Sequence, residues 1–103
     1  MRRNRELEQL KLNAGEAADF LSLLANDKRL LILCELLAAN EMSVGNLADA
    51  VGLSQSALSQ HLSKLRTEGL VETRRKSQTI FYKLSAKEPV TQTLSLLKKL
   101  FCR

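Results

Sequence analysis

Residues 43–70 contain two short helical patterns separated by a single turn, and this spacing constrains the fold more than any other feature of the chain. The first pattern begins at Ser43, a candidate N-cap, and stops at Gly52. Gly52 can adopt the positive φ of a tight turn, Leu53 can fill the angle between two helices, and Ser54 can cap the second helix. The tripeptide Gly52-Leu53-Ser54 therefore predicts a helix-turn-helix.

The second helical pattern, residues 54–70, buries few side chains and turns many polar ones outward. One alanine and three leucines recur at helical spacing and predict a core-facing stripe, namely Ala57, Leu58, Leu62 and Leu65. The side chains between them carry hydroxyl, amide, imidazole and ammonium groups, which suit base edges and phosphates. Singly, such groups also fit a solvated surface, and the imidazole also fits a half-buried packing residue, but their order and spacing favour DNA binding. The residues of this segment expected to contact DNA are Ser54, Gln55, Ser56, Ser59, Gln60, His61 and Lys64.

After Gly69, the expected C′ residue of this helix, the hydrophobic period falls to nearly two. Residues 71–75 and 79–84 are rich in β-branched and aromatic side chains, which predicts a β-hairpin. A hairpin that follows a helix-turn-helix directly is a wing, and a basic tip is expected to meet phosphates or a minor groove. The wing residues expected to contact DNA are Arg74, Arg75, Lys76 and Gln78.

Composition and charge agree with a small DNA-binding domain. A chain of 103 residues with 45% hydrophobic content holds one core, so we expect a single domain over residues 1–103, with residues 1–13 as a flexible extension. Residues 1–42 carry a net charge of −1 and residues 43–103 a net charge of +6, as expected for a half that is steered to a polyanion. The chain shows neither a membrane-spanning apolar run nor a secretory signal, which predicts a cytoplasmic protein with no membrane partner.

Three further helices are expected around the helix-turn-helix and wing. The first starts near Leu7 or Ala14 and ends at Ala25, the second covers residues 27–39, and the last covers residues 88–102. Together the elements predict a mainly α fold with a β-hairpin wing, a winged helix-turn-helix.

The first and last helices carry more apolar surface than a small core needs. The two stripes consist of Leu10, Ala14, Ala17, Ala18, Leu21 and Leu24, and of Val90, Leu94, Leu97, Leu100 and Phe101. We expect a homodimer through these helices, with two recognition helices about 34–36 Å apart on a palindromic operator in double-stranded DNA. The alternative is that both stripes simply complete the core of a monomer.

Residues 24–37, 42–48 and 53–66 resemble the ArsR/SmtB family of bacterial repressors, and residues 78–82 extend the match. The resemblance covers nearly the whole chain from about Ala14 onward. It implies a dimeric winged-helix repressor that leaves its operator when a metal ion or a reactive small molecule binds.

The metal ligands of that family are not evident in this chain. Ser43 and Gly45 lie where arsenic and cadmium sensors carry paired cysteines, and neither side chain supplies a thiolate. The segment after Glu88 contains neither His nor Asp, whereas zinc and nickel sensors place such ligands in the last helix. We therefore expect no metal site and no cofactor, and a metal-responsive repressor stays as an alternative.

Cys34 and Cys102 resemble the pair found in the sulfide- and redox-responsive members of the family, the BigR, SqrR and HlyU type. The resemblance implies that persulfides or related oxidants oxidise the two thiols or bridge them through sulfur, so that the repressor releases DNA. Chemically, one thiolate attacks the oxidant and a second thiol resolves the product. Lys98 and Lys99 favour a thiolate at Cys102, whereas its place at a helix C-terminus opposes one.

Other interpretations stay open. Cys34 alone also fits a small buried hydrophobic residue, in which case the chain is a constitutive repressor of the NolR type and both cysteines are passengers. A winged helix that contacts only proteins would show no salt-dependent affinity for a duplex. An enzyme is not expected, because neither cysteine has an evident base or orienting acid beside it in the sequence. The natural oxidant is also open, since polysulfide, peroxide and nitrosating agents all react with thiols.

Overall fold

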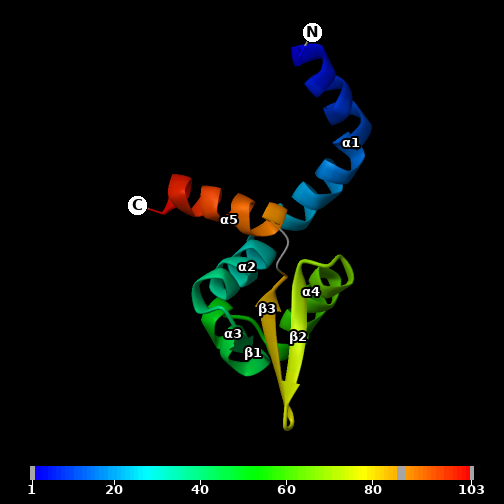
Figure 1. Cartoon of the computed structure of the whole chain (residues 1–103). Helices are drawn as coiled ribbons and strands as arrows, with labels where there is room; N and C mark the ends of the chain where they lie inside the picture. The colour runs from blue at the N-terminus through cyan, green and yellow to red at the C-terminus, as the bar shows by residue number, and fades with distance from the viewer. Residues whose placement is uncertain (1, 86–87, 103) are drawn as a thin grey trace.

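Five helices and a three-stranded sheet make up the part of the chain that the computed structural model describes, residues 2–85 and 88–102 (Figure 1). The elements in chain order are α1 (Arg2–Leu24), α2 (Asp27–Ala39), β1 (Met42–Ser43), α3 (Val44–Val51), α4 (Gln55–Thr67), β2 (Val71–Lys76), β3 (Thr79–Leu84) and α5 (Glu88–Phe101). This arrangement confirms the predicted winged helix-turn-helix, mainly α with a hairpin wing.

α1 begins earlier than the sequence pattern predicted. It starts at Arg2, ahead of both Leu7 and Ala14, because the intervening residues are strong helix formers with no proline or glycine among them. Residues 2–13 are thus helical. The flexibility expected for this segment is a property of its motion, which a single structure does not report, so it stays a prediction.

Arg29 joins the end of α1 to the start of α2. Its guanidinium donates hydrogen bonds to the carbonyl oxygens of Leu23 at 2.8 Å and Ser22 at 3.1 Å, which satisfies acceptors that a helix C-terminus leaves unpaired. Its backbone N–H donates to the side chain of Asn26, the N-cap of α2, at 3.0 Å. Arg29 therefore links the end of α1 to the start of α2 through both its side chain and its backbone.

α3 and α4 form the helix-turn-helix, called the DNA reader below, and both end where the sequence predicts. The hydroxyl of Ser43 accepts from the N–H of Asn46, and Gly52 follows α3 with a φ of 70°. Gly69 has a φ of 79° and follows α4, where its N–H and that of Leu70 return to the carbonyl groups of Arg66 and Leu65. This pair of bonds is a Schellman motif, which confirms Gly69 as the C′ residue.

The core lies between α2, α3, α4, the sheet and the first turns of α5. Its fully buried members include Ile32, Leu33, Leu36, Leu47, Leu58, Leu62, Leu65, Val90 and Leu94. The predicted core stripe of the recognition helix is thus confirmed at its three leucines, whereas Ala57 is only half-buried.

The sheet has the order β1-β3-β2 and is antiparallel throughout. The wing β2–β3 is joined by the two-residue turn Ser77-Gln78, and its register runs from Val71 opposite Leu84 to Lys76 opposite Thr79. β1 was not predicted, because two residues are too few for a periodic pattern. It pairs with Phe81 and Tyr82 in the middle of β3 and so connects the wing to the start of α3.

Candidate nucleic-acid interface

The recognition helix α4 presents one continuous polar face outside the core. Six of the predicted contacts are exposed and His61 is half-buried; the exposed residues are Ser54, Gln55, Ser56, Ser59, Gln60 and Lys64. Ser54 also has a structural role, because its hydroxyl accepts from the N–H of Ala57 at 3.2 Å and lies 3.4 Å from the hydroxyl of Ser56. The face thus combines hydroxyl, amide and imidazole groups with one ammonium group, as DNA base edges and phosphates require.

The wing divides its basic residues between two faces. Residues paired across an antiparallel ladder point to the same side, so Arg75, opposite Ile80, shares a face with Tyr82, two residues further along the strand. Arg74, opposite Phe81, points to the other side. Arg75, Lys76 and the turn residue Gln78 are all exposed, so these three predicted contacts lie free at the tip of the hairpin that projects from the body in Figure 1.

Arg74 is already engaged within the chain. Its Nε donates to Oε2 of Glu41 at 3.0 Å, its Nη2 donates to Oε1 of the same carboxylate, and its guanidinium carbon lies 5.1 Å from the centre of the Phe81 ring. The hydrogen bond from Arg74 lowers the pKa of Glu41, and the same bond raises the pKa of Arg74. In this structure Arg74 links the wing to Glu41, just before β1. To bind DNA, Arg74 would have to exchange this carboxylate for a phosphate, so its contact with DNA stays a prediction.

A polar groove lies between α4 and the wing. It encloses about 420 Å³ and is lined by Ser59, Leu62, Ser63, Arg66, Thr67 and Tyr82. Only Ser59 among these was predicted as a site residue, because the groove joins residues of a helix to a strand residue far along the chain. No local pattern in the sequence indicates which strand side chain will face the helix.

The structure brings the two cysteines into electrostatic reach of each other. Cys34 is half-buried in α2, while Cys102 is exposed directly after α5, where its N–H donates to the carbonyl of Lys98 at 2.9 Å. Burial raises the pKa of Cys34, and the charges of Cys102 and Glu35 raise it further, whereas Lys98 lowers it. Both cysteines are free thiols.

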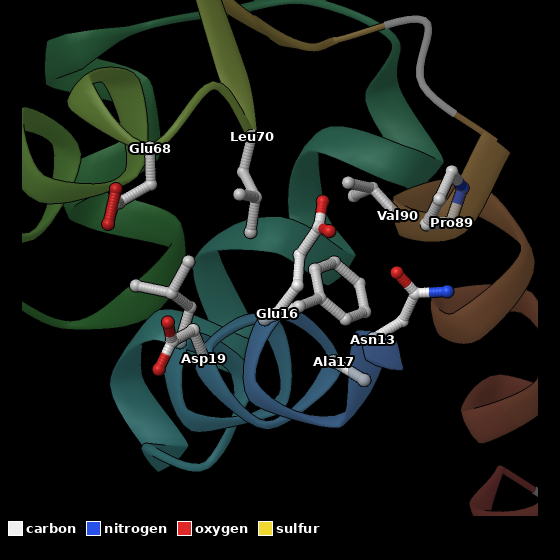
Figure 2. A pocket seen from close by; sticks show the side chains of 10 residues that line it. Asn13, Glu16, Ala17, Asp19, Glu68, Leu70, Pro89 and Val90 are labelled. Carbon is white, nitrogen blue, oxygen red and sulfur yellow. The ribbon is translucent and has the colours of Figure 1, made fainter. Parts of the chain in front are cut away.

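A second concavity, of about 540 Å³, lies away from the wing, between α1, the start of α5 and the segment after α4. Its apolar lining includes Phe20, Leu23, Leu70 and Val90, and its acidic lining consists of Glu16, Asp19 and Glu68. Figure 2 shows Glu16 pointing from α1 toward Leu70 and Val90. Carboxylates repel phosphates, so this pocket is no part of a DNA-binding face.

No group of three or more His, Cys, Asp or Glu side chains is placed to hold a metal ion in residues 2–85 and 88–102. Within the same residues, no helix combines the length and the apolar character needed to cross a membrane.

The fold and the polar face together define a class of protein, the winged helix-turn-helix regulators that bind DNA. The sequence matches the bacterial regulatory protein, arsR family, over residues 26–73. The chain is also 50% identical over 97 residues to the transcriptional activator HlyU of Vibrio cholerae, covering 94% of this chain and 88% of that protein. The chain therefore belongs to the ArsR family of transcriptional regulators, which confirms the predicted resemblance.

Other relatives support the same assignment. The nodulation protein NolR of Rhizobium meliloti is 58% identical over 89 residues, which is 86% of this chain and 71% of that protein. The solved structure of reduced HlyU from Vibrio cholerae covers 93% of this chain and 99% of that one, with 48% identity and a TM-score of 0.86. That of the transcriptional repressor BigR from Xylella fastidiosa covers 93% and 96%, with 38% identity and a TM-score of 0.84. HlyU and BigR bear the names of regulators and not of enzymes.

Proposed function

We propose that this regulator is a homodimeric repressor that binds a palindromic operator and leaves it when Cys34 and Cys102 become linked through sulfur. The observation that carries the proposal is the placement of the only two cysteines, on α2 and at the end of α5, within electrostatic reach of each other. The polar face of α4 supplies the base contacts and the wing supplies basic groups for the backbone. The names of two relatives, a repressor and a protein described in a reduced form, agree with this scheme.

The apolar stripes of the terminal helices support the dimer. Leu10 and Leu21 on α1, and Leu100 and Phe101 on α5, are all more than half exposed, whereas Leu24 and Leu94 reach the core. Each stripe is thus buried where its helix packs against the core and exposed where the helix extends beyond the core. A second copy of the chain would cover these side chains and set the spacing of two recognition helices.

The two cysteines differ in a way that assigns the order of the chemistry. Cys102 is exposed and follows Lys98 and Lys99, whereas burial raises the pKa of Cys34 and disfavours its thiolate. Cys102 therefore attacks the oxidant first and Cys34 resolves the product.

With polysulfide as oxidant, the Cys102 thiolate attacks a sulfane sulfur. A bond forms from its Sγ to that sulfur, the sulfur–sulfur bond of the polysulfide breaks, and a polysulfide one sulfur shorter leaves. The Cys34 thiolate then attacks Sγ of Cys102 and expels hydrosulfide, which leaves a disulfide. The dithiol loses two electrons to the polysulfide. One of its two protons leaves on the hydrosulfide, and the other passes to water.

The bridge would fix the end of α5 against α2 and so change how the terminal helices meet those of a partner. Because the spacing of the recognition helices depends on that contact, the bridged dimer binds the operator less well. A tenfold loss of affinity needs a difference of only about 1.4 kcal/mol between the two arrangements.

The test is fluorescence anisotropy on a duplex from the gene's own promoter at one fixed salt concentration. Reduced protein should bind tightly, and treatment with inorganic polysulfide should weaken binding at least about tenfold, reversibly on reduction. Cys34→Ser and Cys102→Ser should each bind as the reduced chain does and lose the response. A response that persists in both variants contradicts the thiol switch, and weak binding by reduced protein contradicts the repressor itself.

A second candidate is a constitutive repressor whose cysteines have no regulatory role. It is favoured by the 58% identity to NolR. This candidate predicts tight binding that polysulfide leaves unchanged, so the same titration separates the two.

A further inference from the structure

The groove between α4 and the wing gathers hydrogen-bond donors that have no partner among the residues that the structure describes. The hydroxyl groups of Ser59, Ser63 and Thr67 lie along one side of α4, and the phenol of Tyr82 faces them from β3. In the part of the chain that the structure describes, neither the guanidinium of Arg66 nor the hydroxyl of Tyr82 has a hydrogen-bond or ion-pair partner. Arg74 differs, because Glu41 already neutralises it.

The register of the wing extends this groove toward its tip. Thr73, opposite Tyr82, and Arg75, opposite Ile80, lie on the same face of the hairpin as Tyr82. The groove therefore has a cationic group at each end: Arg66 lies on the helix, and Arg75 lies on the strand near the tip of the wing. The opposite side carries Arg74, which is paired, and Lys83.

The shape of a DNA duplex gives this groove a specific occupant. When a recognition helix lies in the major groove and a wing lies against the neighbouring minor groove, one sugar–phosphate strand passes between them. We infer that the groove between α4 and the wing is a seat for backbone phosphates of that strand, with Arg66 and Tyr82 as its main donors. The inference rests on the proposed DNA binding and adds residues to it.

The donors match the chemistry of a phosphodiester. A guanidinium bonds two phosphate oxygens at once, and hydroxyl groups donate to the same oxygens without reading the bases. The seat would therefore set how deeply α4 enters the major groove while contributing equally on every sequence. Leu62, at the bottom of the groove, is buried in the core, so the groove is built directly on the packed part of the helix-turn-helix.

The experiment compares Arg66→Gln and Tyr82→Phe with the wild-type chain on an operator duplex and on an unrelated duplex, over a series of salt concentrations. Lys83→Gln is the matched control, since it removes one positive charge from the residue beside Tyr82 but from the opposite face of the wing. Arg66→Gln should lower affinity about three- to tenfold on both duplexes and reduce the salt slope by about one. Tyr82→Phe should lower affinity about twofold to threefold on both duplexes, and Lys83→Gln should change it less than either.

Several results would overturn the seat. Equal losses for Arg66→Gln and Lys83→Gln would mean that only the overall charge matters, and a loss confined to the operator would mean that Arg66 reads bases. If wild-type protein binds the operator while Arg66→Gln binds it equally well, the seat is wrong and the proposed function stands.

A milder substitution separates the charge of Arg66 from its geometry. Arg66→Lys should retain most of the salt slope but bind less tightly than the wild-type chain, because an ammonium lacks the paired donors of a guanidinium. Affinity equal to that of the wild-type chain would contradict a bidentate phosphate contact. Thermal unfolding of each variant ensures that the compared proteins are folded.

Discussion

In the helix-turn-helix the leucines of α3 and α4 are buried, whereas many leucines of the terminal helices are exposed. Leu58, Leu62 and Leu65 of α4 are at most 1% exposed, so the recognition helix completes its apolar contacts within one chain. Leu21 of α1 is 55% exposed and Leu100 of α5 is 53% exposed. The recognition helix therefore completes its core within one chain, whereas the terminal helices leave large apolar side chains uncovered.

The overall shape of the chain also shows that parts of the terminal helices lie outside the compact core. Its Cα radius of gyration is 15.6 Å, larger than the roughly 13 Å typical of a compact domain of this length. Figure 1 shows the reason, because the start of α1 and the end of α5 extend away from the body in different directions. Burying one leucine fully contributes about 1.5–3 kcal/mol, so the proposed dimer would gain substantial stability by covering these side chains.

The largest effect is expected in the reader. Leu58→Ala opens a cavity at a fully buried position and should lower the free energy of unfolding by about 2–5 kcal/mol in urea titrations. Leu12→Ala is the control, since Leu12 is 84% exposed and should change stability by no more than about 0.5 kcal/mol. A loss at Leu12 as large as that at Leu58 would contradict the contrast between the two regions.

The next effect belongs to the terminal helices. Leu21→Glu and Leu100→Glu place a charge on each uncovered stripe and should weaken dimerisation at least about tenfold, measured by analytical ultracentrifugation. Each monomer should keep its helical circular dichroism, because the core lies elsewhere. Leu12→Glu, on the other side of α1, should leave the dimer intact, and equal weakening there would refute an interface built on the stripes.

Local signals made most of the reader predictable. The caps Ser43 and Ser54 and the turn at Gly52 each act within a few residues, so the sequence alone indicates where α3 and α4 begin and end. The wing was predicted from its β-branched and aromatic residues, but with a three-residue connection. β2 continues through Lys76, which pairs with Thr79, so the turn has only two residues. Burial of the recognition helix also follows from its leucine spacing.

Contacts between distant residues were not predictable from such patterns. Arg74 meets a carboxylate 33 residues away, so the sequence assigned it to DNA without its partner Glu41. The groove residues Arg66 and Tyr82 were missed for the same reason. The proximity of the two cysteines came from a family resemblance, since nothing in their spacing brings α2 and α5 together.

A smaller effect tests a cap inside the reader. Ser54→Ala removes the acceptor for the N–H of Ala57 and should lower the free energy of unfolding by about 1 kcal/mol. Ser56→Ala is the matched control, because Ser56 is exposed and caps no backbone group. Chemical denaturation of both variants measures the difference. Equal losses would show that Ser54 acts only through its bond to Ser56.

The smallest effect concerns the ion pair between Glu41 and Arg74. The pKa of Glu41 is lower in the folded chain than its ordinary value of 4.5, because Arg74 donates hydrogen bonds to it. A lowered folded-state pKa stabilises the fold above the ordinary value, and this contribution is lost as the pH falls through the folded value. The thermal midpoint of the wild-type chain should therefore exceed that of Glu41→Gln near neutral pH, and the two should converge once the pH has fallen through the lowered pKa of Glu41.

A double-mutant cycle isolates this pair. Arg74→Gln alone should remove the same pH-dependent contribution, so adding Glu41→Gln to it should cause little further change at any pH. The coupling should also weaken in high salt, because both side chains are reached by solvent. A coupling close to zero at every pH would mean that Arg74 stabilises the wing through Phe81 and not through the carboxylate. This stabilisation would then depend on ring stacking, and Phe81→Leu would lower the thermal midpoint where Glu41→Gln does not.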